Sequence, residues 1–270
     1  MTPQKIEAAL ADLYEQWAGE SPKLILPLAP SGSERIYYRL QGSEHAAIGT
    51  YSPNDKESRA FLEFSRHFHS KALPVPEIFT EDLNAKVYLQ EDLGSTTLYS
   101  FLIQSDDYFP DYLAQIYKRV VEQLARLQII GGAALDYSHS YPKPAFDKES
   151  MFWDLNYFKY HFLMLTKVRF DEQSLEKDFH ALADYLLTAD DKYFMFRDFQ
   201  SRNIMIKSGE PYFIDYQGGR RGALQYDLAS LLYQAKANIP ADIRQEILHH
   251  YIKVAGELTP INPDTFVEHY

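Results

Sequence analysis

The spacing of apolar and polar residues changes about a third of the way along this chain. Three short runs rich in β-branched and aromatic residues, separated by Gly, Pro and Ser, are typical of strands joined by turns: 23–28, 35–40 and 46–51. An amphipathic segment at 56–70 predicts a helix, and 78–79 and 86–90 predict two further strands. The first third of the chain is therefore expected to form a small antiparallel sheet with one helix.

The pattern becomes mainly helical after Gly94. The clearest helix is 111–128, where apolar residues recur at helical spacing along one face. Four other segments have helical character: 150–166, 175–188, 227–237 and 241–255. A β-like hairpin interrupts these helices, with strands at 193–196 and at 204–206, the latter leading into 212–214.

These patterns predict an α+β class and a two-lobed arrangement. We expect residues 1–93 to form a small β-rich lobe and residues 94–270 to form a helical lobe with a short hairpin inside it. Residues 265–270 resemble the start of a helix without a cap, which leaves open whether the natural chain continues past Tyr270 with a further domain.

Composition narrows the classes of partner. The chain has 270 residues, 46% of them hydrophobic, so it has ample side chains for a core. Its 27 basic and 38 acidic residues give a net charge of -11, which disfavours nucleic acid and anionic membranes as partners because both attract a basic surface. A small phosphate-bearing ligand remains compatible with this charge, since it needs only a local cation or a metal ion.

Other composition features point to a cytoplasmic protein without a membrane span. There are no cysteines, which excludes disulfides and thiolate metal sites. The first ten residues contain Gln, Lys and Glu and lack the apolar segment of a signal peptide. The most apolar stretch, 151–165, is interrupted by charged and amide residues.

One polar constellation carries the chemistry. Apolar runs at 193–196 and 204–206 flank a loop with Asp198 and Asn203, and a third apolar run ends at Asp215. Taken singly, each residue is more often a turn or cap residue than a catalytic one. Placed jointly among three apolar runs, however, they need partners or a ligand. A carboxylate that accepts a proton and further oxygen ligands for Mg²⁺ are what phosphoryl transfer requires.

These motifs resemble those of a known superfamily. Arg-Asp-Phe-Gln-Ser-Arg-Asn-Ile-Met at 197–205 resembles the catalytic loop of the aminoglycoside-phosphotransferase and choline-kinase superfamily. Phe-Ile-Asp-Tyr-Gln at 213–217 resembles its metal-binding segment, and Gln-Tyr-Asp-Leu-Ala-Ser-Leu-Leu at 225–232 resembles the helix that follows. Within the superfamily, the motifs are most similar to those of bacterial kinases that phosphorylate N-acetylmuramate and N-acetylglucosamine at the anomeric position.

The resemblance implies a protein-kinase-like fold and assigns roles. Asp198 would be the catalytic base, and Asn203 and Asp215 would hold Mg²⁺ beside ATP or GTP. Asp227 would be structural, tying the start of its helix to the catalytic loop, which agrees with the preference for acidic side chains at helix N-termini.

The first lobe matches the superfamily less fully. Ser31, Gly32, Ser33 and Arg35 lie between two predicted strands, where kinase-like folds place a loop over the nucleotide phosphates; an ordinary hairpin turn would look the same. The linker between the lobes, whose backbone would pair with the adenine edge, would contain three further nucleotide-binding residues: Gln90, Glu91 and Leu93.

One departure concerns the lysine that kinase-like folds place on the third strand, paired with a Glu on the next helix. The strand at 46–51 has no Lys, although Glu57 stands at the position of its partner. Arg35 or Arg39 could supply the missing charge. The same absence supports an alternative, a pseudokinase that binds nucleotide or regulates without transferring phosphate.

The acceptor site is expected on the aromatic segment 153–163, since sugar sites combine flat apolar rings with carboxylates. The resemblance points to Asp154 as a substrate residue, while a core helix with a polar edge is the other interpretation. Arg202, with Arg197, Arg220 and Arg221, could neutralise charge near the phosphates. Because no long activation segment separates Asp215 from Asp227, a small hydroxylated molecule fits better than a peptide. The sequence thus predicts a small-molecule kinase acting on a hydroxyl of a sugar or amino sugar.

Overall fold

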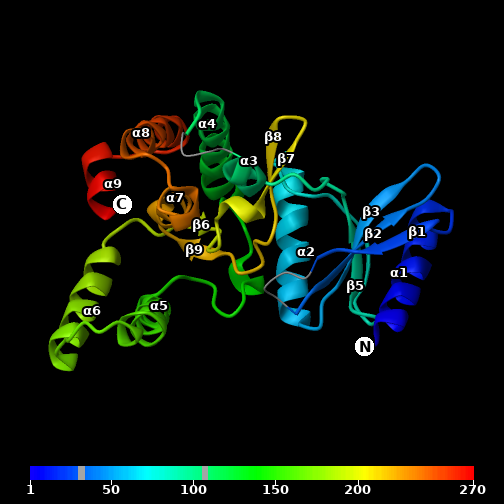
Figure 1. The fold of residues 1–270 in the computed structure, drawn as a ribbon, viewed down its shortest axis with the longest axis horizontal. Coiled ribbons are helices and arrows are strands. Elements are labelled where there is room, and N and C mark those ends of the chain that lie inside the picture. Colours follow the sequence, from blue (N-terminus) through cyan, green and yellow to red (C-terminus); the bar gives the residue numbers. More distant parts are fainter. Residues whose placement is uncertain (30–33, 105–108) are drawn as a thin grey trace.

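The computed structural model describes residues 1–29, 34–104 and 109–270, without the side chain of Gln104. Figure 1 shows two parts, a β-rich part that contains the N-terminus and a helical part that contains the C-terminus. The elements of the first part are α1 (Pro3–Ala18), β1 (Leu24–Pro27), β2 (Ile36–Gln41), β3 (Ala46–Tyr51), α2 (Asp55–Ser70), β4 (Ile78–Asp82) and β5 (Val87–Gln90). The strands and the helix predicted here from the sequence are confirmed to within a few residues.

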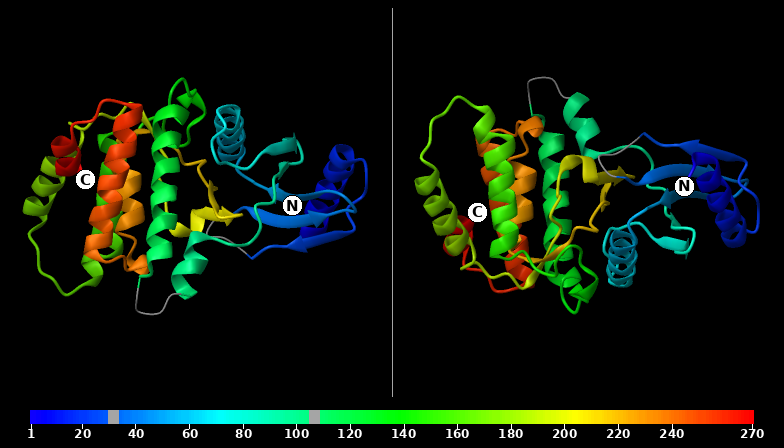
Figure 2. Two further views of the ribbon diagram at one scale, coloured as in Figure 1. Left: turned by 90° about the horizontal axis from the view of Figure 1, so that it is seen from above. Right: turned by 90° about the horizontal axis from the view of Figure 1, so that it is seen from below.

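The five strands of this first part form one antiparallel sheet in the order β1-β2-β3-β5-β4. Alternate residues of a strand face opposite sides, so the sheet is covered on both faces. Val87 and Leu89 of β5 pack with α1, whereas Tyr88 packs against Phe61 of α2. Both views of Figure 2 place α1 and α2 on either side of the sheet.

Helix α1 did not form part of the sequence prediction. Its buried residues are Ile6, Leu10, Leu13 and Tyr14, whose spacing is helical, so the chain does contain the signal. The helix ends at Gly19, which has a φ of +70° and donates its N–H to the Glu15 carbonyl at 2.9 Å.

The second part is mainly helical. Its helices are α3 (Leu98–Gln104), α4 (Asp111–Arg126), α5 (Lys148–His161), α6 (Glu172–Leu186), α7 (Leu224–Leu232), α8 (Ala241–Leu258) and α9 (Pro263–His269). Its strands are β6 (Tyr193–Met195), β7 (Ile204–Lys207), β8 (Glu210–Phe213) and β9 (Arg220–Gly222). The predicted two-part α+β architecture is therefore present.

Three details of the prediction for this part were wrong. β7 pairs with β8, but β6 pairs with β9, a strand that was not predicted, because the loop after β8 returns the chain to β6. Helix α7 begins at Leu224, so Asp227 lies within its first turn and not at its cap. Helix α9 is capped, since the Asn262 side chain accepts a hydrogen bond from the Thr265 N–H at 3.0 Å.

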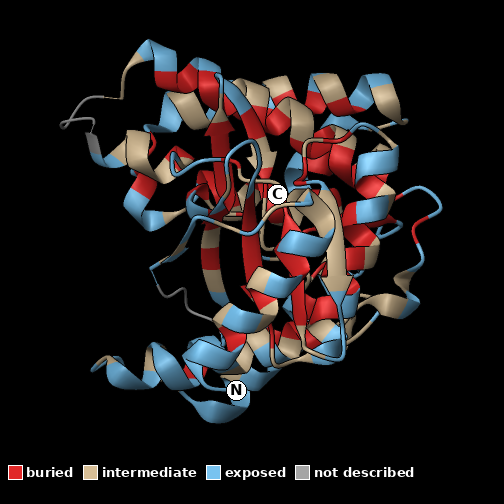
Figure 3. Cartoon of the chain, turned by 90° about the vertical axis from the view of Figure 1, so that its right-hand side faces the viewer, coloured by how far each residue is buried: buried red, intermediate tan, exposed pale blue. Residues whose placement is uncertain are grey.

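The main core lies between α4, α8, α7, α2 and the strands β6 to β8. Figure 3 shows the buried residues, in red, gathered in the middle of the molecule. Helix α4 presents the predicted apolar face and then continues into a π-helical turn, Leu127–Gly131, that carries the buried Gln128. Helices α5 and α6 lie to one side of this core (Figure 1). Among the described residues, no helix is long and apolar enough to cross a membrane.

Candidate active site

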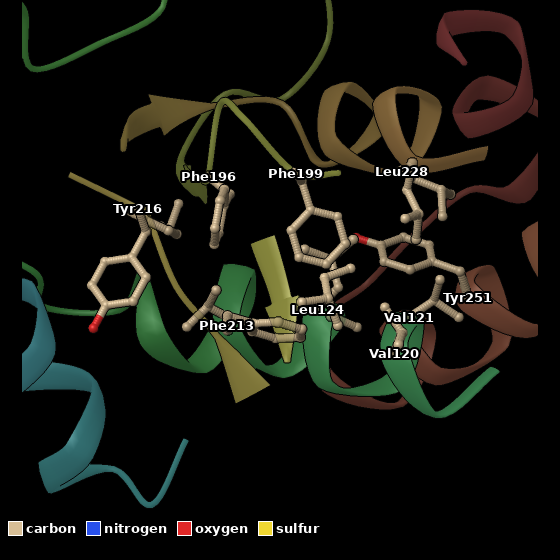
Figure 4. Close-up of a cluster of buried hydrophobic side chains, with 14 of the residues drawn as sticks. Val120, Val121, Leu124, Phe196, Phe199, Phe213, Tyr216, Leu228 and Tyr251 are labelled. Carbon is tan, nitrogen blue, oxygen red and sulfur yellow. The ribbon is translucent and has the colours of Figure 1, made fainter. Parts of the chain in front are cut away.

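The loop between β6 and β7 is anchored by its aromatic residues. Phe196 and Phe199 are fully buried, and Figure 4 shows both rings projecting from the loop into the core beside Phe213. The Phe199 ring lies edge-on to the Phe213 ring, with centroids 5.1 Å apart. Burial of such rings is worth about 1.5–3 kcal/mol each, so the polar residues between them are held in place by the core.

This anchoring brings together Asp198, Asn203 and Asp215, as the sequence predicted. The Asn203 Nδ2 donates to the Asp198 carbonyl at 2.9 Å, and the Ile214 N–H donates to the Asn203 carbonyl at 3.0 Å. One hydrogen bond therefore closes the loop on itself, and the other joins the loop to the segment that carries Asp215.

The carboxylates of Asp198 and Asp215 influence each other. Desolvation, and then the negative charge of Asp215, raise the pKa of Asp198 above its ordinary value. Gln200 Nε2 donates to Asp198 Oδ1 at 3.1 Å, and Gln217 Nε2 donates to Asp215 Oδ1 at 2.8 Å. A carboxylate with a raised pKa beside a fixed negative charge is a candidate for accepting a proton from an acceptor hydroxyl.

The backbone is strained on both sides of this pair. Arg197 has a φ of +85° and Asp215 a φ of +71°, which a residue with a side chain rarely adopts. Such conformations cost on the order of 1–3 kcal/mol each and persist only where surrounding contacts impose them. Their position, immediately before Asp198 and at Asp215 itself, makes this loop pair a candidate functional site.

Asp227 supplies the contacts that impose the loop conformation. Its fully buried carboxylate accepts hydrogen bonds from the Phe196 N–H at 2.8 Å and the Arg197 N–H at 2.9 Å. Gln128 Nε2 donates to the same carboxylate at 2.9 Å, and Tyr251 donates to Gln128 Oε1 at 2.5 Å. The expected tie between Asp227 and the loop is therefore present, but it runs through the side chain inside the helix and not through a cap.

Gln128 was missed in the sequence. It is a single amide inside an apolar face, next to Leu127, and this polar interruption was the available signal. Burial raises the pKa of Asp227 to about 6, although its hydrogen-bond donors act in the opposite direction. The site thus rests on a buried carboxylate whose ionisation is costly and whose two oxygens both accept hydrogen bonds.

Arg35 occupies the place where kinase-like folds have the strand lysine. Its side chain is only 2% exposed, and its guanidinium lies 3.3 Å from Glu57 Oε2 of α2 and 3.4 Å from Asp215 Oδ1. Arg39, the other candidate, instead makes two hydrogen bonds to Asp92, at 2.6 and 3.0 Å. Of the two arginines, Arg35 is therefore the one that pairs with Glu57.

The strand register explains this substitution. Thr50 of β3 is opposite Tyr37 of β2, and Arg35 stands two residues before Tyr37, so all three project toward the same face of the sheet. The preceding residue of β3, Gly49, faces the other side of the sheet, where a Cβ would lie 2.6–2.8 Å from the side chains of Leu40 and Leu10. A cation from the neighbouring strand thus reaches Glu57 while β3 itself carries none.

The linker after β5 contains the predicted nucleotide-binding residues Gln90, Glu91 and Leu93, which all lie among the described residues. The Glu91 N–H donates to the Glu77 carbonyl at 2.9 Å, and its carboxylate pairs with Lys207 at 2.5 Å. Gln90 is buried, and its Oε1 has no hydrogen-bond partner among the described residues. Leu93 is buried as well, and within the described ranges its backbone N–H and C=O make no hydrogen bond. The backbone groups of Leu93 could therefore form hydrogen bonds with a ligand, whereas the Glu91 N–H already donates to Glu77.

The predicted phosphate loop residues Ser31, Gly32 and Ser33 lie outside the described residues.

Asp154 meets the catalytic loop directly. Its carboxylate binds the Arg197 guanidinium through two bonds, at 2.5 and 2.6 Å, and Arg197 also lies over the rings of Phe146 and Tyr226. Tyr226, which the sequence motif contained without an assigned role, donates to Asp154 at 3.4 Å. Asp154 is thus placed beside the loop, with its charge compensated by Arg197.

The other predicted acceptor residues lie apart. Arg202 is exposed, with its guanidinium 4.5 Å from the centre of the Tyr99 ring. Arg221 points to Asp191, at 3.9 Å. Helix α5 is not a core helix, because most of its aromatic rings are exposed: Trp153, Tyr157, Phe158 and Tyr160.

The donor set fits a hard divalent cation. Asn203 bonds to the Asp198 carbonyl through Nδ2, and neither Asn203 Oδ1 nor Asp215 Oδ2 accepts a hydrogen bond from any described residue. Within the described chain no group of three or more His, Asp or Glu side chains gathers for a metal. Two protein oxygens completed by phosphate and water oxygens are what Mg²⁺ uses in nucleotide sites.

A mainly apolar cavity of about 440 Å³ lies between α5, α6, α7 and the C-terminal residues. Met195, Tyr226 and Tyr270 are among its lining residues, but Asp198, Asn203 and Asp215 are not. Chemistry and not cavity size therefore locates the candidate active site.

The comparisons agree with this geometry. A model of the phosphotransferase enzyme family matches residues 25–261. This chain belongs to that family. An N-acetylmuramate/N-acetylglucosamine kinase of Pseudomonas aeruginosa is 23% identical over 257 residues, which cover 93% of this chain and 72% of that protein. A kinase of the same name from Neisseria meningitidis serogroup B is 26% identical over 242 residues, covering 87% of this chain and 69% of that one.

Solved structures show the same fold. An amicoumacin kinase in complex with AMP-PNP and Ca²⁺ has a TM-score of 0.67 at 14% identity, covering 97% of this chain and 79% of that chain. An ADP-bound aminoglycoside phosphotransferase has a TM-score of 0.63 at 12% identity, covering 95% and 86%. The predicted superfamily, its kinase-like fold and the assignment of this phosphotransferase as a small-molecule kinase are confirmed.

Proposed function

We propose that this phosphotransferase moves the γ-phosphoryl group of ATP to a hydroxyl of a sugar or amino sugar, with Mg²⁺ held by Asn203 and Asp215. The observation that carries the proposal is the hydrogen-bonded arrangement of these residues with Asp198 on a loop whose strain Asp227 compensates. The names of the two bacterial kinases support an amino sugar as the acceptor class. The anomeric hydroxyl is a candidate position because of the motif resemblance alone.

In this proposal Asp198 orients the acceptor hydroxyl and accepts its proton as the new phosphate ester bond forms. Its raised pKa suits that role, since an ordinary aspartate is a weak base at neutral pH. Bound Mg²⁺ supplies charge neutralisation on the nucleotide phosphates. Arg35, paired with Glu57 and Asp215, contributes a further fixed cation. The absence of a lysine on β3 was the one sequence feature that favoured a pseudokinase. Arg35 supplies a cation near the same place, which supports the kinase proposal.

The test is ADP release by the purified chain with Mg-ATP and a panel of N-acetylmuramate, N-acetylglucosamine, hexoses and aminoglycosides. We expect turnover with at least one amino sugar, and a product phosphate that mild acid releases if the anomeric hydroxyl is the acceptor. An acid-stable product would remove only the anomeric assignment. Absence of acceptor-dependent ADP release across the panel would remove the sugar-kinase proposal.

The role of Asp198 has its own test. Asp198→Ala is expected to lower kcat by about 10²- to 10⁴-fold while the melting temperature stays near that of the wild type, because Asp198 is exposed and its carboxylate accepts a hydrogen bond from Gln200. Asp242→Ala, an exposed aspartate in the first turn of α8, serves as the matched control with unchanged kcat. Full activity in Asp198→Ala would contradict the assignment.

A further inference from the structure

Arg220, at the start of β9, is a buried cation without an assigned partner. Its residue is 4% exposed, and its Nε donates to the Gly218 carbonyl at 3.1 Å within the same loop. Arg220 forms no ion pair with any residue that the structure describes. Burial, and then the charge of Arg197, lower the pKa of Arg220, which shows that its surroundings do not compensate its charge. A buried charge of this kind is costly unless an anion pairs with it.

The carboxylates near Arg220 are committed to other cations. Asp154 is bound twice by Arg197, and Asp147 pairs with Lys143 at 2.6 Å. Both contribute to the field at Arg220, but neither lies within ion-pair distance of it. The cluster therefore has one cation more than its anions satisfy.

The place of Arg220 in the fold puts it on the acceptor side of the site. It is opposite Met195 across β6 and β9, so both side chains project from the same face, and Met195 packs with Phe146 and Met151 of the α5 region. The charge of Arg197, which adjoins Asp198 in the catalytic loop, acts on Arg220. The charged groups that act on Arg220 are Arg197 of the catalytic loop, Asp154 of α5 and Asp147, which caps α5, whereas Asp198 and Asp215 are not among the principal ones.

The Arg220 guanidinium is not completely enclosed, and the strand that carries it is fixed. Some side-chain nitrogens of the described residues, such as Arg119 Nε, are fully buried and make no hydrogen bond. None of the Arg220 nitrogens combines these two properties. The two terminal nitrogens, which have no partner among the described residues, therefore still touch solvent. The Arg221 N–H donates to the Pro144 carbonyl at 2.9 Å, and the Phe146 N–H donates to the Arg221 carbonyl at 2.8 Å.

We propose that Arg220 binds an anionic substituent of the acceptor, a carboxylate or a phosphate, and so favours acidic sugars over neutral ones. This inference rests on the proposed sugar-kinase function and adds a specificity-determining residue to it. The planar guanidinium suits either anion, because both accept two parallel hydrogen bonds. N-acetylmuramate carries a carboxylate that N-acetylglucosamine lacks, so this pair provides a direct comparison.

The experiment measures kcat and KM for the wild type, Arg220→Met and Arg220→Lys with four acceptors. These are N-acetylmuramate, its neutral methyl ester, N-acetylglucosamine and N-acetylglucosamine 6-phosphate. We expect Arg220→Met to raise the KM for the preferred anionic acceptor on the order of 10- to 100-fold, the worth of a charge-assisted hydrogen bond, with changes of less than about threefold for the neutral ones. Arg220→Lys should restore part of the loss. The two anionic acceptors distinguish a carboxylate from a phosphate site.

Arg221→Met is the matched control, since Arg221 is the adjacent, exposed arginine of the same strand, and it should leave all four KM values unchanged. Three results would each overturn the proposal. Arg220→Met could weaken charged and neutral acceptors equally, or change only the KM for ATP. The wild type could also prefer the methyl ester and N-acetylglucosamine to the charged acceptors. Calorimetric binding of the same four compounds separates the two claims. Arg220-dependent binding of an anion without phosphate transfer supports this subsite while contradicting the kinase proposal; transfer without charge discrimination does the reverse.

Discussion

Replacing Asp227 by Asn tests whether a costly buried charge holds the catalytic loop. The carboxylate takes three donors: the N–H groups of Phe196 and Arg197, and the side-chain amide of Gln128. An Asn has the same shape but only one acceptor oxygen, so its NH₂ group would face at least one of these donors. We therefore expect looser loop geometry and a fall in kcat at pH 7.5 of about tenfold or more, as for an unsatisfied buried donor of about 1–3 kcal/mol.

Although Asp227→Asn is expected to lower activity, its unfolding free energy should become more favourable relative to the wild type as the pH rises. The folded protein keeps the Asp227 proton up to about pH 6, whereas the unfolded chain loses it near pH 3.8. The contribution of this group to stability is therefore complete below pH 3.8 and is lost as the pH rises through 6. The shift corresponds to about 3 kcal/mol, which Asp227→Asn does not lose because an amide does not ionise.

Urea unfolding followed by the fluorescence of the two tryptophans, at pH 4 and pH 7.5, measures this difference. Relative to the wild type, Asp227→Asn should gain about 2–2.5 kcal/mol in unfolding free energy between the two pH values, since pH 4 already lies just above the unfolded pKa. The exposed Asp242→Asn serves as control and should keep a constant difference, within about 0.5 kcal/mol. A constant difference for Asp227→Asn as well, or one that changes in the opposite sense, would refute the reasoning.

Three further predictions concern the site. Arg35→Met, which leaves Glu57 unpaired, should raise the KM for ATP by about tenfold in steady-state kinetics, with Arg35→Lys closer to wild type; an unchanged KM would show that this cation does not serve the nucleotide. Asp154→Asn should mainly affect kcat, because the carboxylate positions Arg197. The fold-decrease in kcat should exceed the fold-increase in the acceptor KM by roughly ten times; a change in KM alone would instead indicate direct contact with the acceptor. Removal of divalent metal by EDTA should abolish turnover, and Mg²⁺ should restore it, whereas turnover that survives chelation would contradict the roles of Asn203 and Asp215.

Local sequence patterns predicted most of the elements because their signals are local. The apolar face of α4 and the alternating strands of the sheet need only neighbouring residues to be recognised. The order of Asp198, Asn203 and Asp215 among apolar runs was readable in the same way, since a loop between buried strands leaves its polar residues at one edge. The helical spacing in α1 was equally local and could have been used.

The pairing of charges, in contrast, was decided only by the tertiary structure. Whether Arg35 or Arg39 reaches Glu57 depends on the register of β2 and β3 and on where α2 lies, which no spacing along the chain encodes. The pairing of β6 with β9 likewise joins segments that are far apart in the sequence, and it brings Arg220 to the side of the lobe that carries α5. Sequence alone determined which chemical groups the catalytic loop offers; the packed structure determined which charges are compensated and which remain for a ligand, because Coulomb interactions depend on distance and burial and not on position in the chain.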